Sequence, residues 1–504
     1  MAQPWPHFGR GRPVEWNGRF EVRSRARDSQ ASDPESDREH ETRSGDRPIL
    51  VARITVLPTR WIALAAVAVW LVSGAYMFHF GASWHLDLRV YRAAGHALYN
   101  GGSPFTAYFT ANRLPFTYTP FALLALSPLA FGRLGLVETG WWLISAASLT
   151  ATVALLLGAP TTASGAVSTA VSSTVSARRA WAVAALLAGV ASLALEPVRS
   201  NFDYGQVNLI LMVMIVADVT VVRRPWRGLL VGLAAAIKLT PLVFLFYFVA
   251  ARQWRSLLRG AAVVVGSIAL TWVVLPSDSV RYWFHEVFDA SRTGALGVVS
   301  NQSWNGMVHR PPFHGGHVGS AVWLVLSLVT LAGGAVLCRW MVAQARTAEA
   351  VLVLALTELL VSPVSWTHHW SWLVVAPIVA ARLWTVHRAV AVSLLVLLGL
   401  AVFAPYLWLR TPPLSYLASN ALVLGGAVVL AAWTAAEWRH PSARVELRSR
   451  SEAAPGPAAG TALGAGSVPD QGPRAGLTSL VTPLAAARRR LGVKPKEQGR
   501  SAHP

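Results

Sequence analysis

Apolar runs long enough to cross a membrane dominate the middle of the chain. Windows of about 20 mostly apolar residues, the length that a helix needs to span a bilayer, recur from Trp61 to Trp438 and are absent before and after these positions. The pattern predicts an all-α, polytopic membrane domain over residues 61–438. A polar tail, 1–60, precedes it, and another, 439–504, follows it.

Neither tail has the composition of a packed domain. Residues 1–50 mix Arg, Asp, Glu, Ser and Pro with few aliphatic residues, so they cannot bury enough apolar area to offset the entropy of ordering. Residues 441–504 are rich in Ala, Gly and Pro and carry a basic cluster at 488–496. We expect both tails to be disordered and cytoplasmic, with the basic cluster either solvated or facing anionic lipid.

Composition and charge agree with a membrane protein. Apolar residues make up 54% of the chain and charged residues only 13%, whereas about a quarter of the residues of a soluble domain are charged. The formal net charge of +20 does not indicate nucleic-acid binding, because the basic residues gather in the tails and in short loops, as the positive-inside rule describes. The single cysteine, Cys338, can form no internal disulfide and no multi-cysteine metal site.

The basic clusters predict the topology. The cytoplasmic ends of the predicted spans are expected near the arginines at 53–60, 178–179, 223–227, 252–259, 339–346, 382–388 and 439. The opposite ends then fall at 81–117, 196–206, around Lys238, and at 276–317, 362–370 and 405–415. This scheme gives roughly 12 spans in the plasma (inner) membrane, with both termini inside. Segment 118–131 is short and contains two prolines, so we interpret it as re-entrant; counting it as a span would invert the linker that follows.

Few acidic residues lie between the tails, which narrows the search for a catalytic carboxylate. Those expected near cytoplasmic ends, and therefore structural, are Glu138, Asp218, Glu349 and Glu437. Those expected at or near the outer face are Asp87, Glu196, Asp203, Asp278, Glu286, Asp289 and Glu358. Asp87 directly follows the first span, where a carboxylate can remove a proton from a hydroxyl on a lipid-attached head group. The alternative is that Asp87 only pairs with Arg89 or Arg92.

Cations and aromatic residues at the same face suggest a site for a charged lipid. Glycosyl transfer from a lipid phosphate releases a phosphate whose charge needs cations or donors, and the candidates are Lys238, Arg199 and Arg310. Lys238 stands in Lys238-Leu-Thr-Pro241, between two short apolar runs, and such a break is tolerated only beside protein or a water-filled cavity. The alternative is that these side chains snorkel to the interface.

A histidine pair stands between two tryptophans in the segment 365–370. His368 or His369 could contact a donor phosphate or an acceptor sugar, and Trp366 and Trp370 suit stacking on a sugar ring. An interfacial aromatic belt is the alternative. A metal site is not expected, because adjacent histidines point apart on a helix and no carboxylate is close in sequence.

Seven motifs in order resemble a known family over about 60–440. They are Asp87-Leu-Arg-Val-Tyr91-Arg92-Ala-Ala-Gly95, Phe116-Thr-Tyr118-Thr-Pro120-Phe121, Glu196-Pro197-Val-Arg199, Gly205-Gln206-Val-Asn208-Leu209, Ile237-Lys238-Leu-Thr-Pro241, Ser300-Asn301-Gln302-Ser303 and Ser362-Pro363-Val-Ser365-Trp366-Thr-His368-His369-Trp370. The chain resembles the actinobacterial polyprenol-phosphate-mannose-dependent α-(1→2) mannosyltransferases, which include the enzyme that extends phosphatidylinositol mannosides, within the glycosyltransferase C superfamily.

The resemblance implies a function and a set of site residues. It implies a glycosyltransferase C type fold with the active site in extracytoplasmic loops, and an inverting transfer of mannose to a mannosylated lipid or cell-envelope glycan, with no cofactor and no nucleotide sugar. Asp87 matches the general base. The expected donor- or acceptor-binding residues are Lys238, His368, His369, Tyr91, Arg92, Gln206, Asn208, Asn301 and Trp366.

Two alternatives remain open at this stage. A polyprenyl-phosphate arabinose or glucose transferase would share the motifs for the lipid phosphate. A lipid or sugar transporter would also have many spans and broken helices, but it would often show repeated halves, and none is visible in the sequence.

Overall fold

The computed structural model describes residues 58–80, 85–158, 177–409, 411 and 414–439. These residues are mostly helical, and the described strands are the two-residue β1 (Tyr108–Phe109) and β2 (Leu114–Pro115), which pair antiparallel. The expected tails, 1–60 and 439–504, lie outside the described residues except for their innermost positions, 58–60 and 439.

Six described helices are long and apolar enough to cross a membrane. They are α2 (Thr59–Phe80), α5 (Leu134–Leu157), α12 (Trp254–Val274), α15 (Gly316–Ala343), α18 (Arg388–Phe403), which passes together with α19 (Pro405–Trp408), and α21 (Ala421–Arg439). A seventh span results if α7 (Ala177–Ala194) and α8 (Glu196–Tyr204), which bend by 84° at Leu195, are counted as one. The protein is therefore embedded in a membrane by several apolar helices.

The remaining helices are shorter. The α-helices are α3 (Leu86–Tyr99), α4 (Pro120–Leu126), α9 (Asn208–Thr220), α10 (Leu229–Ile237), α11 (Leu245–Ala250), α13 (Pro276–Phe284), α14 (Trp304–Val308), α16 (Thr347–Val361), α17 (Ala376–Leu383) and α20 (Leu414–Ser419). The 3-10 helices are η2 (Ser127–Ala130), η4 (Thr240–Phe244), η5 (Glu286–Phe288), η6 (Ala290–Thr293) and η7 (Thr367–Val375). The expected count of roughly 12 spans requires that α9, α10, η4–α11, α16 and η7–α17 also cross, and it stays a prediction.

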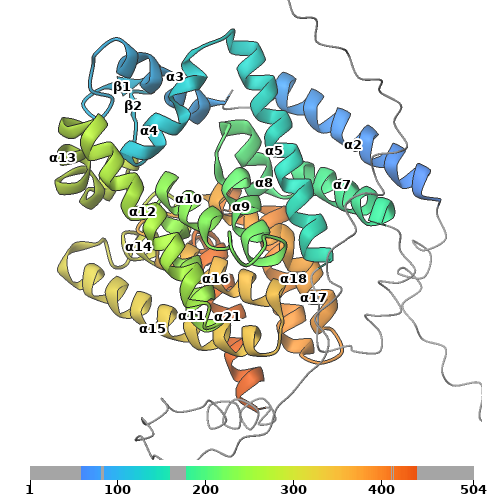
Figure 1. Cartoon of the computed structure of the whole chain (residues 1–504). Helices are drawn as coiled ribbons and strands as arrows, with labels where there is room; N and C mark the ends of the chain where they lie inside the picture. Colours follow the sequence, from blue (N-terminus) through green and yellow to red (C-terminus); the bar gives the residue numbers. More distant parts are fainter. Residues whose placement is uncertain (1–57, 81–84, 159–176, 410, 412–413, 440–504) are drawn as a thin grey trace, which may run out of the picture. The chain divides into compact units, whose positions relative to one another are not determined.

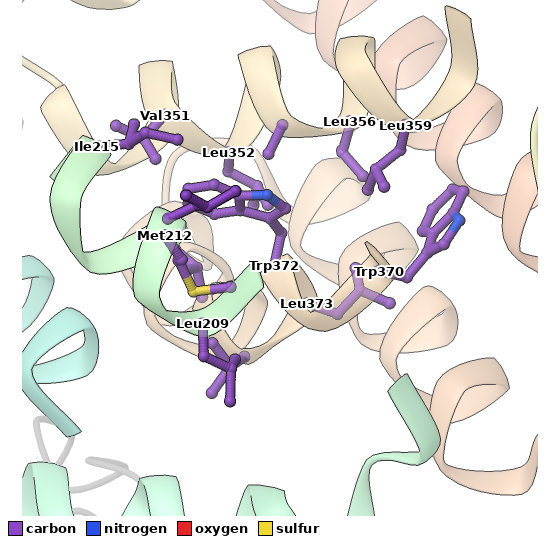
Figure 2. Close-up of a cluster of buried hydrophobic side chains, with 14 of the residues drawn as sticks. Leu209, Met212, Ile215, Val351, Leu352, Leu356, Leu359, Trp370, Trp372 and Leu373 are labelled. Carbon is purple, nitrogen blue, oxygen red and sulfur yellow. The ribbon is translucent and has the colours of Figure 1, made fainter. Parts of the chain in front are cut away.

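A tightly packed centre joins helices that are far apart in sequence. Figure 2 shows buried side chains of α9, α16 and η7 meeting there, among them Met212, Leu352 and Trp372. Almost every residue of α16 is buried. In a bilayer, close packing and hydrogen bonds hold helices together, because lipid is as apolar as the side chains. The centre therefore holds these three elements against one another.

Around this centre, neighbouring helices pack in pairs (Figure 1). The closely packed pairs are α2 with α7, α5 with α7 and α9, α10 with α12, α15 with α16, and α18 with α21. Arginine contacts join the helix ends that carry the basic clusters: Arg259 donates to the carbonyls of Arg224 and Arg227, and Arg346 pairs with Glu437.

The helix ends away from the basic clusters meet at a second set of contacts. The His85 amide donates to the Asp203 carbonyl at 2.7 Å. Tyr406 and Thr367 both donate to Glu196, at 2.6 and 3.0 Å. This end of the molecule contains the loops and short helices of the segments expected to be extracytoplasmic.

Glu138 does not lie where the sequence placed it. It was expected near a cytoplasmic end, but it accepts hydrogen bonds from Arg89 at 3.0 and 3.1 Å and so lies beside α3. The predicted topology puts α3 at the outer end, and α5 begins at Leu134 beside it, so the two expectations cannot both hold. Glu138 is still structural, since the pair holds α3 against α5.

Two further cations at this end bind protein carbonyls. Arg310 is 4% exposed and donates to the carbonyls of Gly297, Val298 and Asn301 and to the Asn420 side chain. Arg199 donates to the Leu193 carbonyl at 3.1 Å. Neither was expected to have this role, since both were candidates for binding phosphate.

We predict that Arg310→Met lowers the thermal stability of the purified protein by several degrees, because it leaves buried carbonyls without a donor, at about 1–3 kcal/mol for each group. Melting followed by intrinsic fluorescence in detergent measures this shift. Arg339→Met, which changes an exposed arginine on α15, is the control and should melt like the wild type. Equal melting of Arg310→Met and wild type would contradict the structural role.

Candidate active site

A cavity of about 490 Å³ lies at the loop-rich end of the molecule. Its walls come from α3, the segment 114–119, the α8–α9 turn, the break after α10, the loop 286–300 and the segment 362–369. Seven of the expected site residues line it: Asp87, Tyr91, Gln206, Lys238, Trp366, His368 and His369. Motifs separated by almost 300 positions in the chain thus meet in one place.

The start of α3 positions Asp87. Gly205 ends α8 with φ of +65°, a left-handed conformation that suits glycine. A Cβ on Gly205 would lie 2.7 Å from the Leu88 Cβ, so only glycine permits this approach of α8 to α3. The next residue, Gln206, is thereby brought to Asp87 and donates a hydrogen bond from Nε2 to Asp87 Oδ2.

Asp87 is a carboxylate in a poorly solvated site. Burial raises its pKa from 3.8 to about 6, while the Gln206 hydrogen bond and the Lys238 charge oppose this rise. The other carboxylate oxygen, Oδ1, has no hydrogen-bond partner in the part of the chain that the structure describes. A carboxylate with a pKa near 6 and a free oxygen in a cavity is well suited to act as a general base at neutral pH.

Lys238 lies where α10 ends. Its backbone is extended, with φ of −140° and ψ of 130°, and Pro241 prevents α10 from continuing. The ammonium donates to Asn208 Oδ1 at 2.8 Å and lies 2.9 Å from His369 Nε2. It also lies 5.6 Å from the centre of the Tyr118 ring. This is the cationic part of the cavity.

The two histidines take different positions, yet both reach the cavity. Their rings lie 4.7 Å apart, with His369 beside Lys238 and His368 against the Tyr204 ring. Nε2 of His368 is buried and has no partner among the described residues. The expectation that neighbouring histidines point apart therefore does not keep either of them out of the site.

The two tryptophans of the same motif separate. Trp366 lines the cavity, whereas Trp370 is fully buried, donates to the Gln302 carbonyl at 3.1 Å and packs against Gly426. The expectation that Trp370 stacks on a sugar was wrong: Trp366 precedes the 3-10 helix η7, and Trp370 lies within it on the side facing the core (Figure 2).

Three expected binding residues do not line the cavity. Asn208 contacts the cavity only indirectly, because its side chain accepts a hydrogen bond from Lys238, which lines the cavity. Arg92 donates to the carbonyls of Leu129, Ala130 and Gly132 and so holds α3 against η2. Asn301 is fully buried, and its side chain accepts from the Ser365 amide at 2.9 Å. The structure gives Arg92 and Asn301 supporting contacts with the chain itself.

The sequence reading missed several cavity residues. Tyr118 was quoted within a motif but not proposed as a site residue, although its hydroxyl bonds to Gln206 at 2.8 Å. Arg292, from the loop 286–300, lines the cavity and pairs with Glu286. The sequence offered two signals, an aromatic residue two positions before a proline and a basic residue in a predicted outer loop, and neither signal is specific.

Comparison with known proteins gives consistent matches. The family model of glycosyltransferase family 87 matches residues 116–363. The chain is 34% identical over 353 residues to a polyprenol-phosphate-mannose-dependent α-(1-2)-phosphatidylinositol mannoside mannosyltransferase of Mycobacterium tuberculosis, covering 68% of this chain and 80% of that protein.

Two proteins of Mycolicibacterium smegmatis are also similar. One has the same name as the M. tuberculosis protein and is 38% identical over 346 residues, or 63% of this chain and 74% of that protein. The other is a polyprenol-phosphate-mannose-dependent α-(1-2)-phosphatidylinositol pentamannoside mannosyltransferase, 34% identical over 306 residues, or 59% of this chain and 70% of that protein.

We predict that the Asp87 carboxyl group titrates near pH 6, because burial raises its pKa to about 6. Infrared difference spectra recorded between pH 4 and pH 8 measure the titration, and the band that disappears in Asp87→Asn identifies the group. Asp289→Asn, which alters another cavity-lining carboxylate, is the control and should leave that band in place. A titration near pH 4 would contradict the buried environment.

Proposed function

The chain belongs to glycosyltransferase family 87 and is a glycosyltransferase, and we propose that it moves mannose from polyprenyl-phosphate mannose to a hydroxyl of a mannosylated lipid or cell-envelope glycan. The product would be an α-(1→2) linkage. The observation that carries this proposal is that one cavity contains a carboxylate, Asp87, and an ammonium, Lys238.

The names of the relatives support the donor and the acceptor. All three relatives are named for polyprenol-phosphate mannose as donor and for phosphatidylinositol mannosides as acceptors. The shared motifs fit a lipid phosphate whatever sugar it carries, so a transferase for polyprenyl-phosphate arabinose or glucose is the alternative outcome of the assay below.

The proposed reaction is a single displacement. The acceptor hydroxyl oxygen attacks the anomeric carbon of a β-linked donor, and Asp87 Oδ1 takes the hydroxyl proton as the new bond forms. The bond between that carbon and the phosphate oxygen breaks, and polyprenyl phosphate leaves with the electron pair. Attack opposite to the leaving group inverts the configuration and gives an α-linked product.

The Lys238 ammonium stabilises the leaving phosphate, and Asn208 and His369 hold the ammonium in place. His368 offers its unpartnered Nε2 to the donor phosphate or the acceptor sugar. A charge that is positioned before the reaction needs no reorganisation as the leaving phosphate forms. Trp366, which is partly exposed in the cavity wall, provides an aromatic face for a sugar ring.

We place the cavity at the extracytoplasmic face in a fold of glycosyltransferase C type. Arginines gather at the opposite helix ends, as in Arg223, Arg255 and Arg388, and such clusters are retained in the cytoplasm. The long helix α2 runs from Thr59 toward Asp87, and the shorter α9 runs from Asn208 away from the cavity. Both termini would then be cytoplasmic, in the plasma membrane.

We predict that Asp87→Asn and Lys238→Met impair transfer in different ways. Without the base, kcat falls by about 10²–10⁴-fold while the KM for the donor stays near its wild-type value. Without the ammonium, the KM for the donor rises and kcat also falls, because both the bound donor phosphate and the leaving phosphate lose their cation. Transfer of labelled mannose by the purified protein, from polyprenyl-phosphate mannose to a panel of mannosylated lipids, measures both.

Asp289→Asn is the matched control for Asp87→Asn, because Asp289 also lines the cavity but accepts from the Ser291 amide, a bond that asparagine can also make. Its kcat should fall far less than that of Asp87→Asn. Normal transfer by Asp87→Asn would remove Asp87 as the base. Transfer of another sugar, with none of mannose, would replace the proposed donor.

We predict that the loop 286–300 faces the outside of the cell. In intact cells, a membrane-impermeant maleimide should label Ser291→Cys but not Arg223→Cys, since both positions are exposed but lie at opposite helix ends. The native cysteine, Cys338, is buried and gives little background. After the membrane is permeabilised, both variants should be labelled. The reverse pattern in intact cells would invert the proposed topology.

A further inference from the structure

We propose that Tyr118 and Tyr91 are positioning residues for the base: they orient the side-chain amide of Gln206 so that its NH₂ group, and not its oxygen, faces Asp87. The inference rests on the proposed function, in which Asp87 is the base. It assigns Tyr91 and Gln206 a role other than direct binding of donor or acceptor.

The proposal starts from a directional chain of hydrogen bonds. Tyr91 donates to the Tyr118 hydroxyl at 2.8 Å, and Tyr118 donates to Gln206 Oε1 at 2.8 Å. Tyr91 also lies 3.3 Å from the same amide oxygen. Gln206 Nε2 then donates to Asp87 Oδ2. Every donor in the chain points toward the carboxylate, an arrangement in which successive bonds strengthen one another.

The orientation of the amide matters because its two ends differ chemically. The oxygen only accepts hydrogen bonds and the NH₂ group only donates them. In the observed orientation the oxygen meets hydroxyl donors and the NH₂ group meets a carboxylate. The reverse orientation would put the amide oxygen against Asp87, which disfavours the ionised carboxylate. The two tyrosines therefore select the orientation that keeps Asp87 able to accept a proton.

The three side chains of this hydrogen-bond series are held firmly. Tyr91 is 1% exposed and Gln206 is 5% exposed. The rings of Tyr91 and Tyr118 pack edge to face with their centres 5.2 Å apart. Tyr91 comes from α3, Tyr118 from the segment before α4, and Gln206 from the α8–α9 turn. Three separate parts of the chain thus converge to orient one amide.

The arrangement also determines which oxygen of Asp87 reacts. Oδ2 accepts from Gln206, which leaves Oδ1 for the acceptor hydroxyl. The charged group that acts on Asp87 most directly is Lys238. The other titratable groups in the cavity wall are Tyr91, Tyr118, Tyr204, Tyr282, Glu286, Asp289, Arg292, His368 and His369. A variant that changes only a tyrosine hydroxyl keeps every formal charge in this set at neutral pH.

The test is the pH dependence of kcat/KM for Tyr118→Phe, Tyr91→Phe, Gln206→Met and the double variant Tyr118→Phe/Gln206→Met. The wild-type rate should fall below about pH 6, where Asp87 takes up a proton. Loss of the oriented donor destabilises the carboxylate, so the pKa of Asp87 rises and the fall begins at higher pH. The shift should be largest for Gln206→Met, and the KM for the donor should stay near its wild-type value.

The double variant distinguishes an effect of Tyr118 that passes through Gln206 from an effect of Tyr118 on Asp87 itself. If Tyr118 acts through Gln206, Tyr118→Phe adds no further shift to that of Gln206→Met. Tyr282→Phe changes a buried tyrosine of the same cavity for which no hydrogen bond to Gln206 is present, and its pH profile should keep the wild-type midpoint. Unshifted profiles for both single tyrosine variants, or additive shifts in the double variant, would overturn the proposal.

The infrared titration of Asp87 requires no catalysis, so it tests this inference separately from the proposed function. If the wild type transfers no mannose, the proposed function fails, but the infrared titration of Asp87 still decides the inference. The Asp87 band should then titrate at higher pH in Tyr118→Phe and in Tyr91→Phe than in the wild type. An unchanged midpoint in both folded variants would overturn the positioning role, whatever the reaction is.

Discussion

The break between α10 and η4 places an ammonium at the end of a membrane-domain helix, and the rest of the site depends on it. Within hydrocarbon a helix satisfies its own backbone, so an interruption is stable only beside protein or water. Here Thr119 caps α4 and donates to the Ala236 carbonyl at 2.5 Å, which joins the end of α10 to the segment that carries Tyr118. Asn208 and His369 then surround the Lys238 ammonium.

The packed centre supplies the rigidity that this break lacks. Asn208 begins α9, and His369 lies in η7, and both elements pack with α16 in the buried cluster of Figure 2. Asp87 is held separately, by the contact of Gly205 with Leu88 and by the pairing of Arg89 with Glu138. The base and the cation therefore have different supports, which are joined at the α8–α9 turn, where Gln206 binds Asp87 and Asn208 binds Lys238.

Much of this site could be predicted from the sequence, because charged and aromatic residues are rare near membrane spans and stand out. Asp87, Lys238, Trp366 and the two histidines were identified in this way, and the structure brings them together. The family resemblance supplied Gln206, which spacing alone would not have identified.

The remaining errors have a common physical origin, since a sequence motif does not say which way a side chain points. Trp366 and Trp370 would share one face of an α-helix, but the turn between them is a 3-10 helix, so one lines the cavity and the other enters the core. Arg310 and Arg199 were candidate phosphate-binding cations but donate to backbone carbonyls. The contacts that decide these roles join residues far apart in the chain.

The central claim is a single displacement in which Asp87 removes the proton from the acceptor while phosphate leaves from the opposite side. The most direct measurement is the anomeric configuration of the product formed from a donor of defined β configuration, determined by nuclear magnetic resonance. The account predicts an α-linked mannose. A β-linked product would show retention and would contradict a mechanism in which Asp87 serves only as the base.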